Sequence, residues 1–239
     1  MKTFLIISAI LLSVFLFSCS ETTDSSDNPY VKVVAEMNSN VVSNAMMTVK
    51  NPDIQANDID SIVIKDFRIL LSRLKFQAKT GDNDPNDDEH EMKVGPFILQ
   101  LDSTGNSFTL ASGEIPEGIY SKIKFELHRF SGDELDTFKD DPVYGEFATE
   151  DRYSAIISGV IFEAELQDEF TFNATVTANL MLEFEPEIVF EEGGDYTIVL
   201  ELDPDSAFIG KDGILDPRIQ KDANDIENAI KSAFKALKK

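Results

Sequence analysis

The chain has 239 residues, of which 21 are Lys or Arg and 44 are Asp or Glu, giving a formal charge of -23. A charge of this sign repels phosphate backbones and anionic lipid surfaces, which argues against nucleic-acid binding and against electrostatic attachment to a membrane. One cysteine excludes an internal disulfide framework and a Cys-based zinc cluster, and two histidines are too few for a His-rich metal site. Hydrophobic residues make up 42% of the chain, enough for a substantial core.

An apolar segment at the N-terminus, residues 4–18, follows Lys2 and has the length of the hydrophobic region of a signal peptide. It is shorter than the roughly 20 residues that a helix needs to cross a bilayer. The segment ends in LFSC, residues 16–19, which resembles the lipobox of bacterial lipoproteins. The resemblance implies that signal peptidase II removes residues 1–18 and that Cys19 is acylated with palmitate-type chains. An ordinary secretory signal that ends in a chance cysteine is the alternative.

Residues 19–29 are polar and without periodicity, which predicts a flexible tether that carries the lipid. Ser20, and not Asp, follows the cysteine, and the resemblance to enteric lipoprotein sorting then favours the outer membrane. The acidic, Ser-rich tether also resembles the surface-export tethers of Bacteroidota lipoproteins. We therefore expect a lipid-anchored protein of the cell envelope, at the outer membrane and facing the periplasm or the cell surface, with a single folded domain over residues 30–239.

Alternation of apolar and polar residues predicts β-strands through most of the mature chain. In residues 170–184, Phe, Ala, Val and Leu fall on one face and Thr and Asn on the other, with Met181 as the exception. Alternation of this length predicts one long, half-buried antiparallel strand. Shorter alternating runs lie at 30–37, 41–49, 97–101, 119–130 and 196–202.

Two runs depart from simple alternation. Residues 153–166 are apolar on both faces in the middle, which predicts a central strand covered on both sides, with Gly159 at a bulge or a close approach. Residues 61–78 alternate at first, but the adjacent pair Leu70-Leu71 breaks the phase. We expect one long bent strand with a bulge near this pair, or two strands, and a helix through residues 66–76 is the alternative.

Turn sequences at 102–106 and 191–195 separate the predicted strands. Roughly eight to ten strands with short turns predict an all-β fold, either a sandwich or a barrel, and we favour an antiparallel β-sandwich. The lipobox, the tether and the strand-rich region with the sequence IPEGIYSKIKFEL together resemble Bacteroidota β-sandwich lipoproteins of unknown function. The entry into that strand is similar to immunoglobulin-like and transthyretin-like modules.

The C-terminal segment changes to a helical period. Apolar residues recur on one helical face over residues 224–238, which predicts an amphipathic helix that packs on the sandwich. Asn224 is a candidate N-cap, with Glu227 in the capping-box position. A helix that contacts a partner protein is the less favoured alternative.

Residues 81–91, GDNDPNDDEHE, form a dense acidic segment of the kind that Ca²⁺ binds, since this ion takes about six to eight oxygen ligands. The candidate ligands are Asp82, Asp84, Asn86 and Asp88. Their spacing copies the first half of an EF-hand loop, but Asp87 stands where that loop needs Gly and Lys93 where it needs Glu. A solvated acidic loop is the default interpretation, and Ca²⁺ is the one cofactor that the sequence suggests. In the second acidic segment, residues 202–217, we favour a turn-rich connection over a metal site.

The sequence contains no GxSxG elbow, P-loop, HExxH or GxGxxG motif, and acylation leaves no thiol as a nucleophile. We therefore predict that the protein is not an enzyme. We expect a binding, adhesion or envelope-assembly module whose partner is an envelope protein or a glycan. The alternative is a surface hydrolase that uses two carboxylates, as glycosidases do. Ser103, in an expected turn, matches the short Asp-Ser-Thr form of the O-glycosylation motif of Bacteroidota. The oligomeric state stays open.

Overall fold

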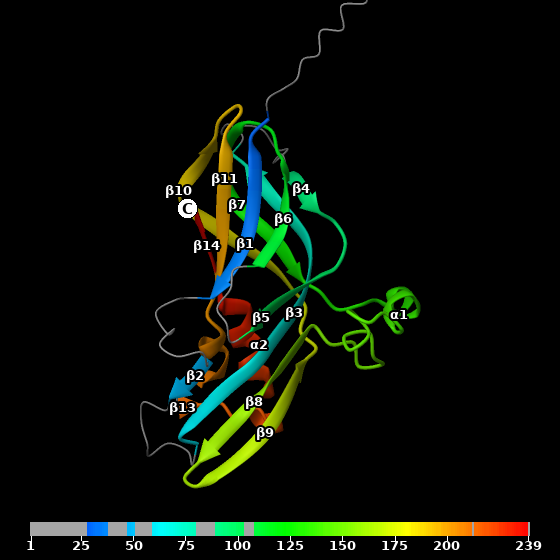
Figure 1. The fold of residues 1–239 in the computed structure, drawn as a ribbon, viewed down its shortest axis with the longest axis vertical. Helices are drawn as coiled ribbons and strands as arrows, with labels where there is room; N and C mark the ends of the chain where they lie inside the picture. The colour runs from blue at the N-terminus through cyan, green and yellow to red at the C-terminus, as the bar shows by residue number, and fades with distance from the viewer. Residues whose placement is uncertain are drawn as a thin grey trace, which may run out of the picture.

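The computed structural model describes residues 28–37, 47–50, 59–79, 89–102, 108–211 and 213–238. In these ranges the chain forms an elongated structure in which a four-stranded sheet lies against the upper half of an eight-stranded sheet (Figure 1). Side chains from both sheets meet in one hydrophobic core. The predicted all-β sandwich with a C-terminal helix is thereby confirmed.

The smaller sheet consists of β1 (Tyr30–Met37), β6 (Phe108–Glu114), β11 (Asp195–Leu202) and β14 (Phe234–Lys238), in the order β14-β11-β1-β6. β1 pairs with β11 in parallel, and the other two pairings are antiparallel. The sheet is therefore mixed, whereas the sequence predicted purely antiparallel sheets. Parallel neighbours need a long crossover, and here the whole of the larger sheet lies between them in the sequence.

The larger sheet is organised around β3 (Ser61–Ala78), a strand of 18 residues. Its other strands are β2 (Met47–Lys50), β4 (Glu89–Lys93), β5 (Phe97–Asp102), β7 (Gly118–Leu127), β8 (Ala155–Glu163), β9 (Leu166–Ala174) and β10 (Ala178–Phe190). Along one edge β3 pairs with β8 and then β7, and along the other edge with β2, β5 and β4. β9 extends the sheet beyond β8, and β10 beyond β7. The long strand is confirmed, and the helix alternative for residues 66–76 is wrong.

Two β-bulges in β3 explain why its hydrophobic pattern changes phase. The register slips by one residue at Lys65 and again between Ser72 and Lys75, where Arg73 has a positive φ of 56°. Each extra residue moves the core-facing positions by one, since side chains alternate between the two faces. The core-facing residues are Ile62, Ile64, Phe67, Ile69, Leu71, Leu74 and Phe76.

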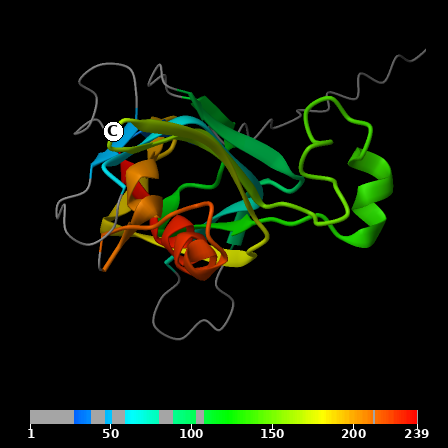
Figure 2. The same cartoon turned by 90° about the horizontal axis from the view of Figure 1, so that it is seen from below.

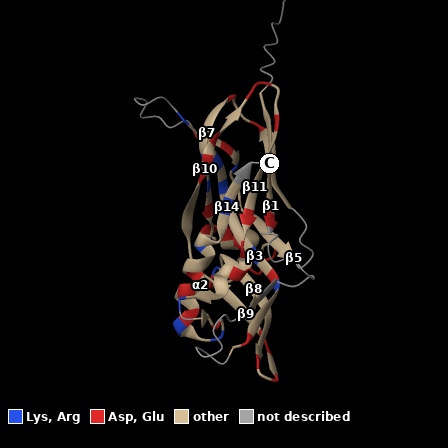
Figure 3. Cartoon of the chain, turned by 90° about the vertical axis from the view of Figure 1, so that its left-hand side faces the viewer, with Lys and Arg blue, Asp and Glu red and all other residues tan. Residues whose placement is uncertain are grey.

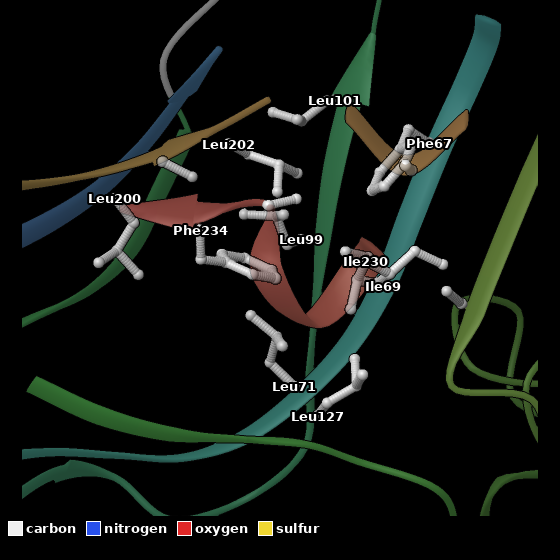
Figure 4. Packing of buried hydrophobic residues seen from close by; sticks show 14 of the residues in the cluster. Phe67, Ile69, Leu71, Leu99, Leu101, Leu127, Leu200, Leu202, Ile230 and Phe234 are labelled. Atoms are coloured by element: carbon white, nitrogen blue, oxygen red, sulfur yellow. The ribbon is translucent and has the colours of Figure 1, made fainter. Parts of the chain in front are cut away.

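Leu70 and Leu71 are both buried because both faces of the larger sheet are covered at this height. Leu71 belongs to the core between the sheets (Figure 4). Leu70 lies on the opposite face, in a second hydrophobic cluster with Phe130, Phe147 and Ile156. The pair Leu70-Leu71 breaks the alternation because hydrophobic clusters cover both faces of β3 at this point. The predicted bulge lies just after the pair.

Residues 128–154, which connect β7 to β8, supply this second cover. They include α1 (Gly132–Phe138) and form a lobe at one side of the molecule (Figure 2). The connection leaves and rejoins the sheet at Leu70, whose carbonyl oxygen accepts a hydrogen bond from His128 N at 2.9 Å. The Leu70 N–H donates to the carbonyl oxygen of Ser154 at 2.8 Å. A single residue of β3 thus marks where β7 ends and β8 begins.

β8 is covered on both faces, as its apolar sequence predicted, and Gly159 lies at a close approach. A Cβ atom on Gly159 would lie 2.2 Å from the carbonyl oxygen of Val63 and 2.8 Å from the Phe170 ring. Gly159 also faces the first bulge of β3, because its pairing partner Ile64 is the last residue before the slip. Of the two alternatives predicted for this glycine, the close approach is confirmed, and the bulge lies in the neighbouring strand β3.

The single strand predicted over residues 170–184 is wrong, because the chain breaks between Ala174 and Ala178. β9 ends opposite Ala155 of β8, and β10 starts opposite Leu127 of β7. The break lies at the level where β7 ends and β8 begins, and the 128–154 lobe connects these two strands. The apolar side chains keep the predicted face through the break, so hydrophobic periodicity does not detect it.

The C-terminal helix is shorter and lies earlier than the predicted 224–238. α2 (Gln220–Ser232) begins after Ile219 with no side-chain cap, so the Asn224 capping box is wrong. Glu227 instead accepts a hydrogen bond at 2.7 Å from the backbone N–H of Thr175, in the break between β9 and β10. After Ala233 the chain becomes β14, because pairing with the edge of β11 overrides the helical period. The predicted apolar face is partly confirmed, since Ile230 is buried in the core (Figure 4).

Between β11 and α2 the chain forms a short 3-10 helix, η2 (Pro204–Phe208), and the small hairpin of β12 (Ile209–Gly210) and β13 (Gly213–Ile214). η2 buries Ala207 and Phe208 in the core, and the Phe208 ring lies 5.7 Å from that of Phe170. The turn-rich connection favoured for residues 202–217 is therefore confirmed in its described part, which omits only residue 212.

Candidate functional site

The site residues proposed from the sequence lie outside the described residues. These are the lipid attachment residue Cys19, the candidate calcium ligands Asp82, Asp84, Asn86 and Asp88, and the O-glycosylation candidate Ser103. Where the structure describes the chain, no three or more His, Cys, Asp or Glu side chains gather as a metal site. In the same ranges we find no helix with the length and hydrophobicity of a membrane span.

A pocket of about 350 Å³ opens on the face of the larger sheet that points away from the smaller sheet. Four strands meet there: β3, β4, β7 and β10. Three basic and two acidic residues line it, in a chain that has twice as many acids as bases. The lining residues are Arg73, Lys75, Glu89, Lys124, Phe125, Glu126, Asn179, Leu180 and Met181.

The second bulge of β3 shapes one wall of this pocket. Arg73 is the extra residue, its φ of 56° lies in the left-handed region, and its side chain is 66% exposed. Non-glycine residues adopt this conformation at a cost of about 1 kcal/mol, and bulges of this kind are common beside binding sites. The only ion pair of Arg73 within the described residues is a long one, with Nε 3.6 Å from Glu126 Oε2. Most of its guanidinium group is therefore available to a ligand.

Beyond the bulge, Lys75 of β3 stands directly opposite Lys124 of β7. Like charges in directly opposite positions destabilise a sheet. Glu89, the first residue of β4, relieves this repulsion by bridging the two lysines. Lys124 Nζ donates to Glu89 Oε1 at 2.7 Å, and Lys75 Nζ donates to Glu89 Oε2 at 3.1 Å. The hydrogen bonds from Lys124 and Lys75 lower the pKa of Glu89 below its usual value, so it carries a full negative charge at neutral pH.

Glu126 forms the opposite side of the pocket and connects it to the 128–154 lobe. Its Oε2 accepts a hydrogen bond from Ser72 Oγ at 3.1 Å. Its Oε1 lies 3.9 Å from Nδ1 of His128, whose Nε2 lies 3.3 Å from Glu134 of α1. His128 thus lies between two glutamates, and its side chain is only 15% exposed.

Met181 provides an apolar wall. It pairs with Lys124 across β10 and β7, and it is 52% exposed on the polar face of the sheet. Asn179, two residues earlier on the same face, stands opposite Glu126. Met181 is the residue that broke the alternation of its strand in the sequence, and the structure places this exception in the pocket.

The acidic segment around η2 contains a second unusual group, the carboxyl of Asp205. This residue is 9% exposed, and its buried Oδ1 finds no hydrogen-bond partner within the described residues. Burial, together with the nearby charge of Asp203, raises the pKa of Asp205 to about 6. Asp216, in contrast, is bound by Arg218, which also pairs with Glu163 and Asp168 of the β8–β9 hairpin. Figure 3 shows acidic residues, in red, at the tip of this hairpin.

Sequence analysis did not identify the pocket, because its residues come from four separate strands. The available signals were Met181, which interrupts the polar face of its strand, and the lysines Lys122 and Lys124 on the polar face of β7. Comparison with protein-family models, with curated proteins and with solved structures gave no match. The geometry of this pocket and the lipobox-like sequence are therefore the features that point to a function.

Proposed function

We propose that the protein is a lipid-anchored, non-catalytic binding module of the cell envelope, and that the pocket beside Arg73 is its ligand site. The observation that carries this proposal is the reversal of charge at the pocket. Although the chain is strongly acidic, three basic residues, Arg73, Lys75 and Lys124, line the pocket on one exposed sheet face. Arg73 lies at a strained bulge. Strain of this kind persists where the surrounding structure enforces it, and it is typical of ligand sites.

The chemistry of the pocket supports binding over catalysis. Hydrolysis by two carboxylates needs a general acid whose pKa is raised. Two lysines instead lower the pKa of Glu89, so this residue holds no proton to donate at neutral pH. The carboxylate-pair hydrolase is therefore the less supported alternative.

Anchoring explains how a pocket of this kind serves the envelope. Acylation of Cys19 fixes the chain to a membrane, because each buried CH₂ of an acyl chain adds about 0.8 kcal/mol. Residues 20–29 then form the tether to β1, which begins at Tyr30. The pocket lies on a sheet face of the folded domain, and the length of the flexible tether limits how far from the lipid it reaches.

The test is to map a ligand onto the sheet. The full chain in mild detergent is titrated with a panel of neutral and acidic oligosaccharides while its amide NMR signals are recorded. We expect shifts that centre on residues 72–75, 124–126 and 179–181, and their loss in Arg73→Ala. Shifts that map only to the smaller sheet, or a complete lack of shifts over the panel, would contradict the proposal.

A further inference from the structure

We propose that the pocket binds a carboxylated sugar, such as a uronic acid. In the free protein the Glu89 carboxylate occupies the position of the ligand carboxylate, and the ligand displaces it on binding. This inference rests on the proposed function, because it names the ligand class of the same pocket. The key geometry is a single carboxylate that spans two ammonium groups from different strands, with its oxygens 2.7 Å and 3.1 Å from Lys124 Nζ and Lys75 Nζ.

The two lysines form a site that requires an anion. They occupy directly opposite positions of β7 and β3, and without a bridging charge they repel each other. Any carboxylate that enters the pocket meets the same pair of donors that Glu89 uses. The bound conformation of Glu89 therefore shows the geometry that a ligand carboxylate would adopt.

Glu89 can leave without disrupting the fold. It is the first residue of β4, and its side chain is 35% exposed. β4 is held independently of that side chain by its backbone pairing with β3. Its other face packs inward, with Met92 against the core and the His90 ring 5.7 Å from that of Tyr120. Release of the Glu89 carboxylate costs two charge-assisted hydrogen bonds, which an incoming carboxylate replaces.

The rest of the pocket fits a sugar better than a peptide or a bare anion. Arg73 and Asn179 supply donors, and Glu126 supplies an acceptor, so both kinds of hydroxyl hydrogen bond are available. Met181 offers an apolar wall for the C–H face of a ring. A volume of about 350 Å³ falls within the range of small-ligand sites, and its polar lining suits a ligand that carries many hydroxyls.

A purely structural ion cluster would have the same contacts but a different response to mutation. Lys122 and Glu183 form such a pair on the same sheet face, at 3.4 Å and outside the pocket lining. Glu183→Gln is therefore the matched control for Glu89→Gln. Both variants remove one negative charge from the same face, and only one of them frees the two lysines.

The experiment measures binding of trigalacturonate to the full chain in mild detergent by calorimetry, with neutral trigalactose and a triglutamate peptide as comparisons. If Glu89 occupies the lysines for about nine-tenths of the time, removing its charge tightens uronate binding about tenfold. We expect this gain in Glu89→Gln and in Glu89→Ala, no change in Glu183→Gln, and loss of the preference for uronate in Lys75→Gln. Thermal melting of each variant confirms that it is folded.

Several results would overturn the inference. If Glu89→Gln binds uronate no better than the wild type while Arg73→Ala abolishes binding, the pocket is a ligand site but Glu89 is structural. Equal binding of trigalactose or triglutamate excludes a carboxylated sugar as the specific ligand and leaves the binding function intact. If neither the wild type nor Glu89→Gln binds any of the three probes, the inference is wrong, and the NMR titration decides the proposed function separately.

Discussion

Replacing Asp205 with Asn should stabilise the protein at alkaline pH much more than at acid pH. The buried carboxyl has its pKa raised from 3.8 to about 6, mainly by desolvation. The folded state therefore binds this proton more tightly than the unfolded chain does, and the stability that protonated Asp205 provides is lost as the pH rises from about 4 to about 6. Ionisation in the folded state costs on the order of 3 kcal/mol at about pH 8, and about 1 kcal/mol of this cost remains at about pH 4.5.

Urea unfolding of the wild type and of Asp205→Asn, followed by far-UV circular dichroism because the chain has no Trp, measures this difference. We expect the stability gain of Asp205→Asn to grow by about 2 kcal/mol between about pH 4.5 and about pH 8. Taking the difference between the two proteins cancels the titration of distant acids, and Asp195→Asn, at an exposed position, is the control. The same gain at both pH values would show that Asp205 is not ionised at a cost, and the explanation from burial would be wrong.

Three further substitutions test the fold and the anchor. Leu70→Ala should lower the free energy of unfolding in urea by about 2 to 5 kcal/mol, because it opens a cavity under the 128–154 lobe. A loss smaller than that of Leu166→Ala, at an exposed position, would refute the burial of both faces of β3. Gly159→Ala should cost about 1 to 3 kcal/mol, because its Cβ meets the Val63 carbonyl, and an unchanged unfolding midpoint would show that the sheet adapts freely. Cys19→Ser should move the protein from the membrane fraction to the soluble fraction and remove the acyl mass, and membrane retention without acylation would exclude the lipid anchor.

The parts of the fold that were predictable from the sequence are those that local periodicity encodes. β1, β5, β7 and β11 lie close to their predicted bounds, and Gly159 lies where its strand approaches another backbone. The predictions were wrong where a segment distant in the sequence determines the local structure. The break between β9 and β10 follows from the lobe that separates β7 from β8, and β14 forms because β11 offers it an edge.

The pocket was beyond sequence analysis for the same reason, and the second bulge of β3 shows why. An extra residue in a strand reverses the face of every residue after it, so one insertion at Arg73 puts Lys75 outside and Phe76 inside. Without the bulge, continued alternation from Leu71 would turn Lys75 toward the core and leave Phe76 exposed. The residue that corrects the core packing of β3 also brings Lys75 opposite Lys124 and turns its own guanidinium group toward solvent. The strained position at Arg73 is therefore retained for two reasons, one in the core and one at the candidate site, and a deletion of this residue should disrupt both together.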